Sequence, residues 1–166
     1  MLNKLSFSLL ALKDFNELEN LLKILKKKKI KFVELPLARL LPNYRLNKKK
    51  ILTFKNLLKK YKIKVSATQG IFFKKKLNVF NKNHLKKNIN HLKKIIYLSK
   101  LLGSKLIIFG SPLNRKIKKN PKYKDFEISN FITLLKKIEK SLIKNKIFFL
   151  LEPNSKFYKC NFITNS

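Results

Sequence analysis

Short apolar runs alternate with longer amphipathic segments along the whole chain. Five apolar runs predict strands at residues 4–12, 30–37, 63–69, 104–110 and 146–151. The four segments between them repeat their apolar residues at three- and four-residue spacing, which predicts helices at 14–29, 48–61, 83–102 and 125–145. Strands and helices in this order predict an α/β fold of parallel (β/α) repeats with right-handed crossovers.

The last apolar run ends on a carboxylate. Residues 147–151 are all apolar and lead directly into Glu152, which predicts a strand buried on both faces. A buried carboxylate without a partner is strongly unfavourable, so Glu152 is expected to meet a metal ion, a cation or backbone donors. Glu34 interrupts the second strand in the same way. The alternative for each is an ion pair with one of the many lysines.

Only these two of the eight acidic residues interrupt strands. The others lie in predicted helices, in first turns or, for Glu139, on a helix face, where capping, helix-dipole and solubility roles suffice. Carboxyl ends of parallel strands meet at one rim, and ligands of α/β folds bind there. Glu34 and Glu152 are therefore expected to face the same rim.

Further polar residues follow the strand ends. Gln69 and Asn154 close the third and fifth strands, and Ser111, Asn114 and Arg115 follow the fourth. Amides and a guanidinium at a rim suit a hydroxylated or phosphorylated ligand. Loop capping is the alternative for Ser111 and Asn114. Arg115 is one of only three arginines among 41 basic residues, which favours a bidentate or stacked role that lysine does not fill.

Other chemistry finds little support. His84 and His91 lie seven residues apart on a helix expected outside the sheet, so structural or solvated roles are favoured over metal binding. The single cysteine, Cys160, forms no internal disulfide and is expected to be a small, semi-apolar residue. The sequence has no glycine-rich phosphate fingerprint, and no Ser-His-Asp or Cys-His arrangement can be assembled.

The net charge of +33 first points to a nucleic acid or an anionic membrane. The lysines, however, are spread through every segment between the strands, and the richness in Lys, Asn, Ile and Phe follows A/T-rich codon usage. We therefore expect weak, salt-sensitive polyanion binding and no specific nucleic-acid partner. No apolar run approaches the roughly 18 residues that span a membrane, so no membrane partner and a cytoplasmic location are expected.

Four stretches together carry a resemblance to a known family: FVELPL, VSATQGIFF, LGSKLIIFGSPLNR and FFLLEPNSKFYKCNFITN. The chain resembles the xylose-isomerase-like TIM-barrel superfamily, and within it the sugar-phosphate isomerase/epimerase branch. The resemblance implies a (β/α)8 barrel with a divalent metal ion (Mn, Zn or Mg) at the carboxyl rim. It implies that Glu152 is a metal ligand and that Glu34 lies near the substrate.

The implied activity is proton transfer next to a carbonyl group of a small sugar or sugar phosphate. Glu152 and Glu34 would be the catalytic residues. The substrate-binding residues would be Gln69, Ser111, Asn114, Arg115 and Asn154. A DNA-repair endonuclease on the same barrel is an alternative, but that branch carries a metal-binding histidine where this chain has Gln69. A non-catalytic basic remnant is the other alternative.

The family's remaining metal ligands, an Asp, a His and a Glu, come from strands six to eight, in barrels of about 250 residues. The 166 residues therefore predict a single, incomplete TIM-barrel-like domain over 1–166, with about five strands and four helices. Such a chain is expected to be either a fragment or an open sheet. An open sheet would have unpaired edges and exposed apolar surface, which a homo-oligomer could cover.

Overall fold

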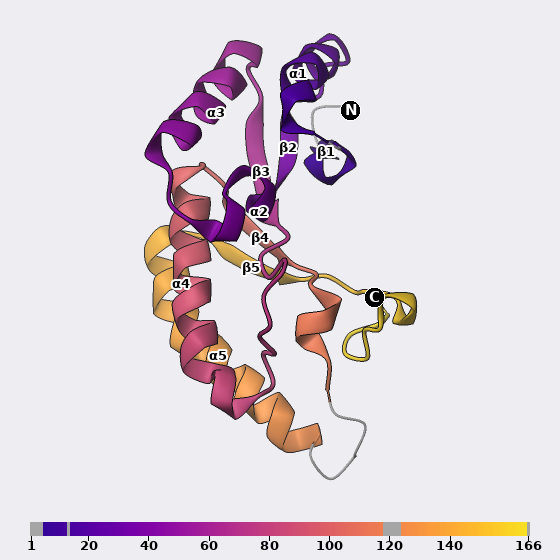
Figure 1. Cartoon of the computed structure of the whole chain (residues 1–166), viewed down its shortest axis with the longest axis vertical. Coiled ribbons are helices and arrows are strands. Elements are labelled where there is room, and N and C mark those ends of the chain that lie inside the picture. Colours follow the sequence, from indigo (N-terminus) through magenta and orange to yellow (C-terminus); the bar gives the residue numbers. More distant parts are fainter. Residues whose placement is uncertain (1–4, 13, 118–123, 166) are drawn as a thin grey trace.

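A computed structural model describes residues 5–12, 14–117 and 124–165 (Figure 1). Within them, five parallel strands form one sheet in the order β1-β2-β3-β4-β5. The strands are β1 Ser6–Ser8, β2 Phe32–Pro36, β3 Lys64–Gln69, β4 Leu106–Phe109 and β5 Phe148–Leu151. The predicted α/β fold of parallel repeats is confirmed.

The helices follow the predicted segments closely. They are α1 Leu18–Lys27, α2 Leu37–Leu40, α3 Lys48–Tyr61, α4 Leu85–Leu101 and α5 Lys124–Asn145. Asp14 caps a 3₁₀ turn, Phe15–Glu17, that leads into α1, because its side chain accepts a hydrogen bond from the Asn16 backbone N–H. The short α2 was not predicted. No helix in the described segments is long and apolar enough to cross a membrane.

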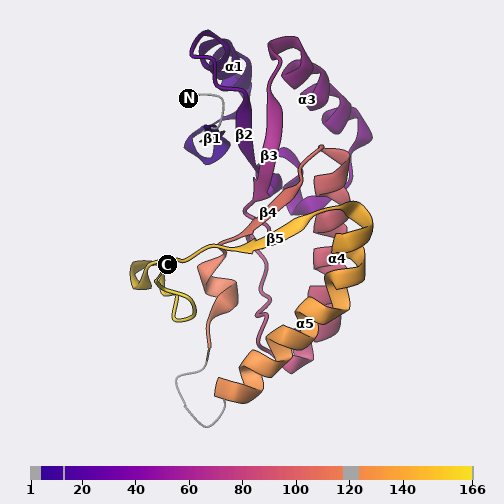
Figure 2. The same cartoon turned by 180° about the vertical axis from the view of Figure 1, so that it is seen from behind.

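Figures 1 and 2 show α3, α4 and α5 on one side of the sheet, with the C-terminal segment on the other. The core lies between the strands and this helical layer. Its fully buried members come from both, and include Leu35, Ile95, Ile107 and Leu134. Because all strands are parallel, their carboxyl ends lie at one edge of the sheet, where the loops that lead into the helices begin.

The first strand is shorter than predicted. Residues 4–12 were expected to be extended, but β1 ends at Ser8 and residues 9–11 form a 3₁₀ turn. The turn begins there because the Ser8 hydroxyl accepts a hydrogen bond from the Leu10 backbone N–H. Arg39 Nη1 then donates to the Leu12 carbonyl oxygen and ties this segment to α2.

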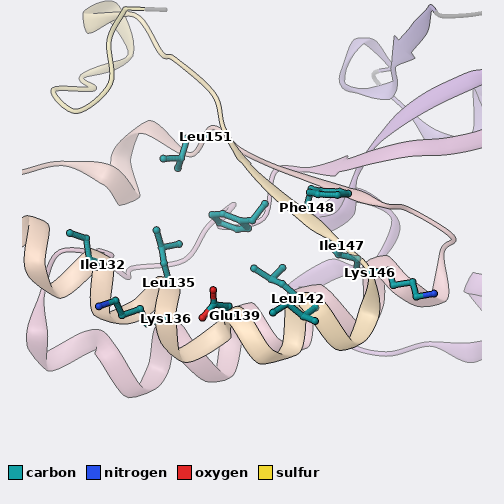
Figure 3. A pocket seen from close by; sticks show the side chains of 11 residues that line it. Ile132, Leu135, Lys136, Glu139, Leu142, Lys146, Ile147, Phe148 and Leu151 are labelled. Carbon is teal, nitrogen blue, oxygen red and sulfur yellow. The ribbon is translucent and has the colours of Figure 1, made fainter.

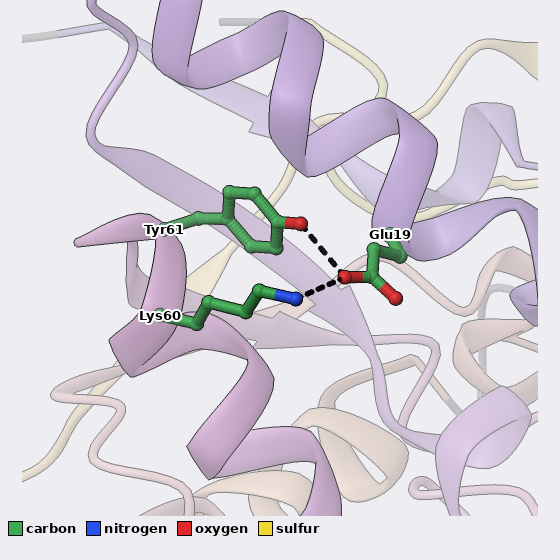
Figure 4. A network of polar contacts seen from close by, with 3 residues as sticks. All are labelled: Glu19, Lys60 and Tyr61. Atoms are coloured by element: carbon green, nitrogen blue, oxygen red, sulfur yellow. Dashed lines mark hydrogen bonds and ion pairs between the residues drawn. The ribbon is translucent and has the colours of Figure 1, made fainter.

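Two helices are joined by a carboxylate that the sequence had assigned to a first-turn role. Glu19 of α1 accepts hydrogen bonds from Lys60 Nζ and Tyr61 Oη of α3, each at 2.7 Å (Figure 4). The bond from Lys60 lowers the pKa of Glu19, and that from Tyr61 lowers it further. This contact holds α1 against α3, in addition to any interaction of Glu19 with the helix dipole.

The prediction that the fifth strand is buried on both faces is wrong. Phe148 and Leu150 project from the same face of β5 and are 68% and 42% exposed, because no described segment covers them there. On its other face a mainly apolar hollow of about 670 Å³ lies between β5 and α5 (Figure 3). Leu135, Leu142 and Phe149 line it, beside the carboxylate of Glu139.

Candidate functional site at the strand ends

The carboxyl ends of the first three strands bring three polar side chains together. Gln69, at the end of β3, donates from Nε2 to the Ser8 hydroxyl at 2.6 Å and to Glu34 Oε2 at 3.3 Å. The register between β2 and β3 shifts at Val33 and Glu34. Such a bulge re-aims the side chains beside it, and here it accompanies the turn of Glu34 toward Gln69. Ser8 was not among the predicted site residues.

Glu34 is a half-buried carboxylate with an elevated pKa. Burial raises the pKa of its carboxyl above the ordinary value, and the negative charge of Glu152 raises it further. Such repulsion falls off with distance, so it is consistent with two carboxylates that share the carboxyl rim. That Glu34 and Glu152 act together in one site stays a prediction.

Glu152 lies across the end of the neighbouring strand, over Gly110. A Cβ atom on Gly110 would collide with Glu152 Oε2 and would lie 3.5 Å from the carboxyl carbon. Asn154 Nδ2 donates to Glu152 Oε2 at 3.3 Å. Glycine at position 110 therefore makes room for the Glu152 side chain. Glu152 is exposed, so the expectation that burial demands a partner for it does not apply.

Arg115 lies beneath this arrangement and has no exposed surface. Its Nη2 donates to the Glu152 backbone carbonyl at 2.6 Å, and its guanidinium carbon is 5.5 Å from the centre of the Phe109 ring. Nε and Nη1 have no hydrogen-bond acceptor among the described residues. Burial lowers the pKa of Arg115, which Cys160 and Glu152 partly oppose. Arg115 is therefore stacked on Phe109 and anchors the backbone at Glu152.

Asn114 and Ser111 shape the loop that follows β4. Asn114 Nδ2 donates to the carbonyl oxygens of Lys75 at 2.9 Å and Leu77 at 2.6 Å, so its amide ties this loop to the one after β3. Ser111 has a φ of 37° and a ψ of 59°, a left-handed conformation that is rare for a residue with a side chain. Asn114 thus makes the loop contacts of the capping alternative, and a direct substrate contact stays a prediction for both residues.

The loop after β3 is held by aromatic and histidine side chains that sequence reasoning did not place in the site. The buried Tyr44 donates its hydroxyl to the Gly70 carbonyl at 2.7 Å. His91 Nε2 lies 2.6 Å from the Ile71 carbonyl oxygen, and burial lowers its pKa to about 4. The His84 ring accepts a hydrogen bond from the Asn78 backbone N–H. The hydrophobic periodicity of the sequence predicts only the helices and turns that contain these residues, and not their contacts with the loop.

The described residues supply only part of a metal-ligand set. No three His, Cys, Asp or Glu side chains within the described segments group closely enough to hold a metal ion. A zinc site normally takes three or four protein ligands, whereas magnesium can bind through one or two carboxylates with water and substrate oxygens. Glu34 and Glu152 alone therefore do not fit a zinc site, and they would provide at most the carboxylate share of a magnesium site.

No protein-family model matches the sequence, and no curated protein matches it either. Solved structures do. A sugar phosphate isomerase/epimerase from Parabacteroides distasonis superposes with a TM-score of 0.70 at 13% identity, over 91% of this chain and 51% of that one. A D-psicose 3-epimerase, solved in the presence of D-fructose, gives a TM-score of 0.69 at 10% identity, over 92% of this chain and 53% of that one.

A xylose isomerase-like TIM-barrel protein from Mycobacterium smegmatis, in complex with magnesium, gives a TM-score of 0.54 at 14% identity. The superposition covers 86% of this chain and 48% of the Mycobacterium smegmatis chain. The chain thus spans about half the length of these structures, and at such identities the likeness concerns the fold. The resemblance drawn from the sequence is confirmed at that level: the described chain has the fold of about half of a xylose-isomerase-like TIM barrel.

Proposed function

We propose that this chain provides one side of the active site of a sugar or sugar-phosphate isomerase/epimerase, which moves a proton at a carbon next to a carbonyl group. The observation that carries the proposal is the placement of two carboxylates, Glu34 in β2 and Glu152 directly after β5, in one parallel sheet whose fold is shared with isomerases and epimerases. Two carboxylates on one rim can take a proton from one position of a substrate and return it at another.

Glu34 is the better suited of the two to carry the proton. Its pKa is raised by burial and by Glu152, and a carboxylate with a raised pKa is a stronger base. Gln69 donates to Glu34 and can keep that carboxylate oriented toward a substrate. Glu152, held over Gly110 and contacted by Asn154, is exposed and free to meet a cation or a substrate hydroxyl.

The remaining predicted residues are assigned by where they lie. Ser111 and Asn154 are proposed to contact substrate hydroxyl groups. Asn114 and Arg115 act on the substrate through the loops and backbone that they hold. A divalent metal ion, when bound, would polarise the substrate oxygens. Glu152 is its proposed ligand, and water and substrate oxygens would complete the coordination, as magnesium allows.

The test is solvent deuterium incorporation at the carbon next to the carbonyl of ketoses and ketose phosphates, followed by NMR with added magnesium or manganese. We expect incorporation by the unaltered chain, and a loss of about a hundredfold or more for Glu34→Gln. Glu139→Gln, which removes a carboxylate from α5, is the matched control and should retain the rate. Absence of incorporation, or full retention in Glu34→Gln, would contradict the proposal.

The phosphodiesterase alternative is favoured by one observation, the net charge of +33. Gln69 disfavours this function, because it stands where the endonuclease branch carries a metal-binding histidine. Its amide donates hydrogen bonds to Ser8 and Glu34 and offers no metal-binding imidazole. Incision of abasic DNA by this chain, lost in Glu152→Gln, would reverse the ranking of the two functions.

A further inference from the structure

The loop after β3 carries three consecutive lysines beside the carboxyl rim. Lys74, Lys75 and Lys76 line a hollow of about 620 Å³. Gly70, the residue after β3, and Ser111, just beyond β4, line the same hollow. Three lysines therefore border a mainly apolar hollow that opens where β3 and β4 end.

The backbone of this loop is fixed at several points. Tyr44 holds Gly70, His91 holds Ile71, and the Asn114 amide holds Lys75 and Leu77. Lys74 itself has a positive φ of 57°, which turns the chain at the first of the three lysines. A ligand would therefore meet a loop whose backbone is already in place, and binding would require less ordering of the chain.

The three lysines have no opposite charge to neutralise them within the described segments, where the only ion pair is that of Lys60 with Glu19. Lys74 Nζ lies 5.6 Å from the centre of the Phe73 ring, and Lys75 Nζ lies 5.5 Å from that of Tyr44. Phe73 and Leu113, on either side of the hollow, are 60% and 66% exposed. The hollow thus combines unneutralised positive charge with apolar walls.

We propose that Lys74, Lys75 and Lys76 bind the phosphate group of a small phosphorylated ligand in this hollow. That the rest of the ligand is a sugar reaching Gln69 and Glu34 rests on the proposed function. A phosphate monoester carries close to two negative charges at neutral pH and accepts several hydrogen bonds, which suits a group of neighbouring lysines. The phosphate would sit over the lysines, while the hydroxylated part would extend along the rim.

A small phosphate is favoured over a nucleic acid by the placement of the charge. Nucleic-acid binding requires a basic path along which successive phosphates lie. Lys74, Lys75 and Lys76 instead surround a single hollow at the carboxyl ends of two strands. A second lysine-lined hollow, of about 480 Å³, lies at the opposite ends of the strands and includes Lys55, Lys59, Lys62 and Lys64. Replacing three of these four lysines gives a control that removes the same number of charges away from the rim.

The experiment is a titration of the ¹⁵N-labelled chain with inorganic phosphate, followed by amide NMR shifts at about 0.15 M salt, where bulk charge effects are largely screened. We expect shifts concentrated at residues 70–76 and 111–114. Replacing Lys74, Lys75 and Lys76 together by Gln should weaken binding by about tenfold or more. The same replacement at Lys55, Lys59 and Lys62 should leave it within about twofold. Arg at positions 74–76 keeps the charge and should keep binding.

Equal losses in the two Gln variants, or shifts spread over lysines in general, would mean bulk electrostatic attraction and would overturn the proposal. So would the absence of binding, or a single-stranded oligonucleotide that engages both lysine groups alike. The readout is independent of catalysis. If deuterium incorporation is seen without phosphate binding, only this inference fails. If phosphate binds through the three lysines without incorporation, the isomerase proposal fails and the phosphate site stands.

Discussion

Replacement of Arg115 by Met tests the structure at its most unusual buried group. The guanidinium has no exposed surface, yet only Nη2 has an acceptor within the described segments. Met is unbranched and of similar length, so it can fill most of the space without adding a polar group. The variant removes a charge, one hydrogen bond and one ring contact, and it also removes two donor nitrogen atoms, Nε and Nη1, that have no partner.

The opposing contributions are similar in size. A hydrogen bond from a charged donor stabilises by about 1.5–3 kcal/mol. The contact with Phe109 adds about 0.5–2 kcal/mol. Against them, each buried N–H without an acceptor costs about 1–3 kcal/mol, and Arg115 has Nε and Nη1 in that state. We therefore expect Arg115→Met to change the free energy of unfolding by less than about 1.5 kcal/mol, in either direction.

Urea unfolding of the unaltered chain, Arg115→Met and Arg115→Ala measures these changes. Ala leaves a cavity that Met fills, so it should be less stable than Met by about 2 kcal/mol or more. A loss above about 3 kcal/mol for Met would refute the reasoning, since it would mean that Nε and Nη1 do have acceptors in solution. If the two variants were equally stable, the side chain would not be packed as described.

Three other changes follow from the site and its charges. The raised pKa of Glu34 means that the folded state holds this proton more tightly than the unfolded state, so the melting temperature should fall as pH rises above about 4.5. Glu34→Gln should make this fall smaller, and a steeper fall in the variant would contradict the prediction. Gly110→Ala should cost less than about 1 kcal/mol, because the Glu152 side chain can rotate away, but it should abolish any metal binding that depends on Glu152; unchanged metal affinity by calorimetry would disprove the placement. Raising salt from about 0.02 to about 0.5 M should raise the melting temperature, because it screens the repulsion of a chain with net charge +33; a decrease would show that attractive pairs dominate.

That Glu34 and Glu152 lie toward one edge of the sheet could be predicted from topology alone. Once the strands are parallel and the helices cross over in one sense, every carboxyl end lies at the same edge of the sheet. How close the two carboxylates come also depends on the curvature of the sheet, because β3 and β4 lie between β2 and β5. The same reasoning placed Gln69 beside Glu34, and the structure joins the two by a hydrogen bond.

The hydrogen bonds of Arg115 and Asn114 and the exposure of Glu152 could not be predicted, because they depend on contacts between segments that are distant in the sequence. Asn114 binds carbonyls of residues 75 and 77, and Arg115 binds that of Glu152, in contacts that no periodicity reports. The apolar run before Glu152 predicted burial on both faces. Burial on both faces, however, requires a packed layer over each face, and Phe148 and Leu150 of β5 are left exposed on one of them.

The composition also determines which kind of bond can hold such a rim. With 41 basic and eight acidic residues, most lysines cannot find a carboxylate, so ion pairs cannot order the loops. Neutral amides can. Asn114 ties the loops after β3 and β4, Asn88 Nδ2 donates to the Asn78 carbonyl at 2.9 Å, and Asn161 both accepts from and donates to the Ile117 backbone.

Hydrogen bonds from neutral side-chain amides depend little on the positive potential of the surrounding lysines. The binding of an anion to those lysines does depend on it, and is therefore sensitive to salt. Salt should therefore weaken phosphate binding at Lys74–Lys76 and leave the loop that presents them in place. The amide shifts of residues 70–80 in the absence of phosphate should accordingly be almost constant across a salt range in which phosphate affinity falls severalfold. A loop that rearranged with salt would instead be ordered by charge, against the contacts described for it.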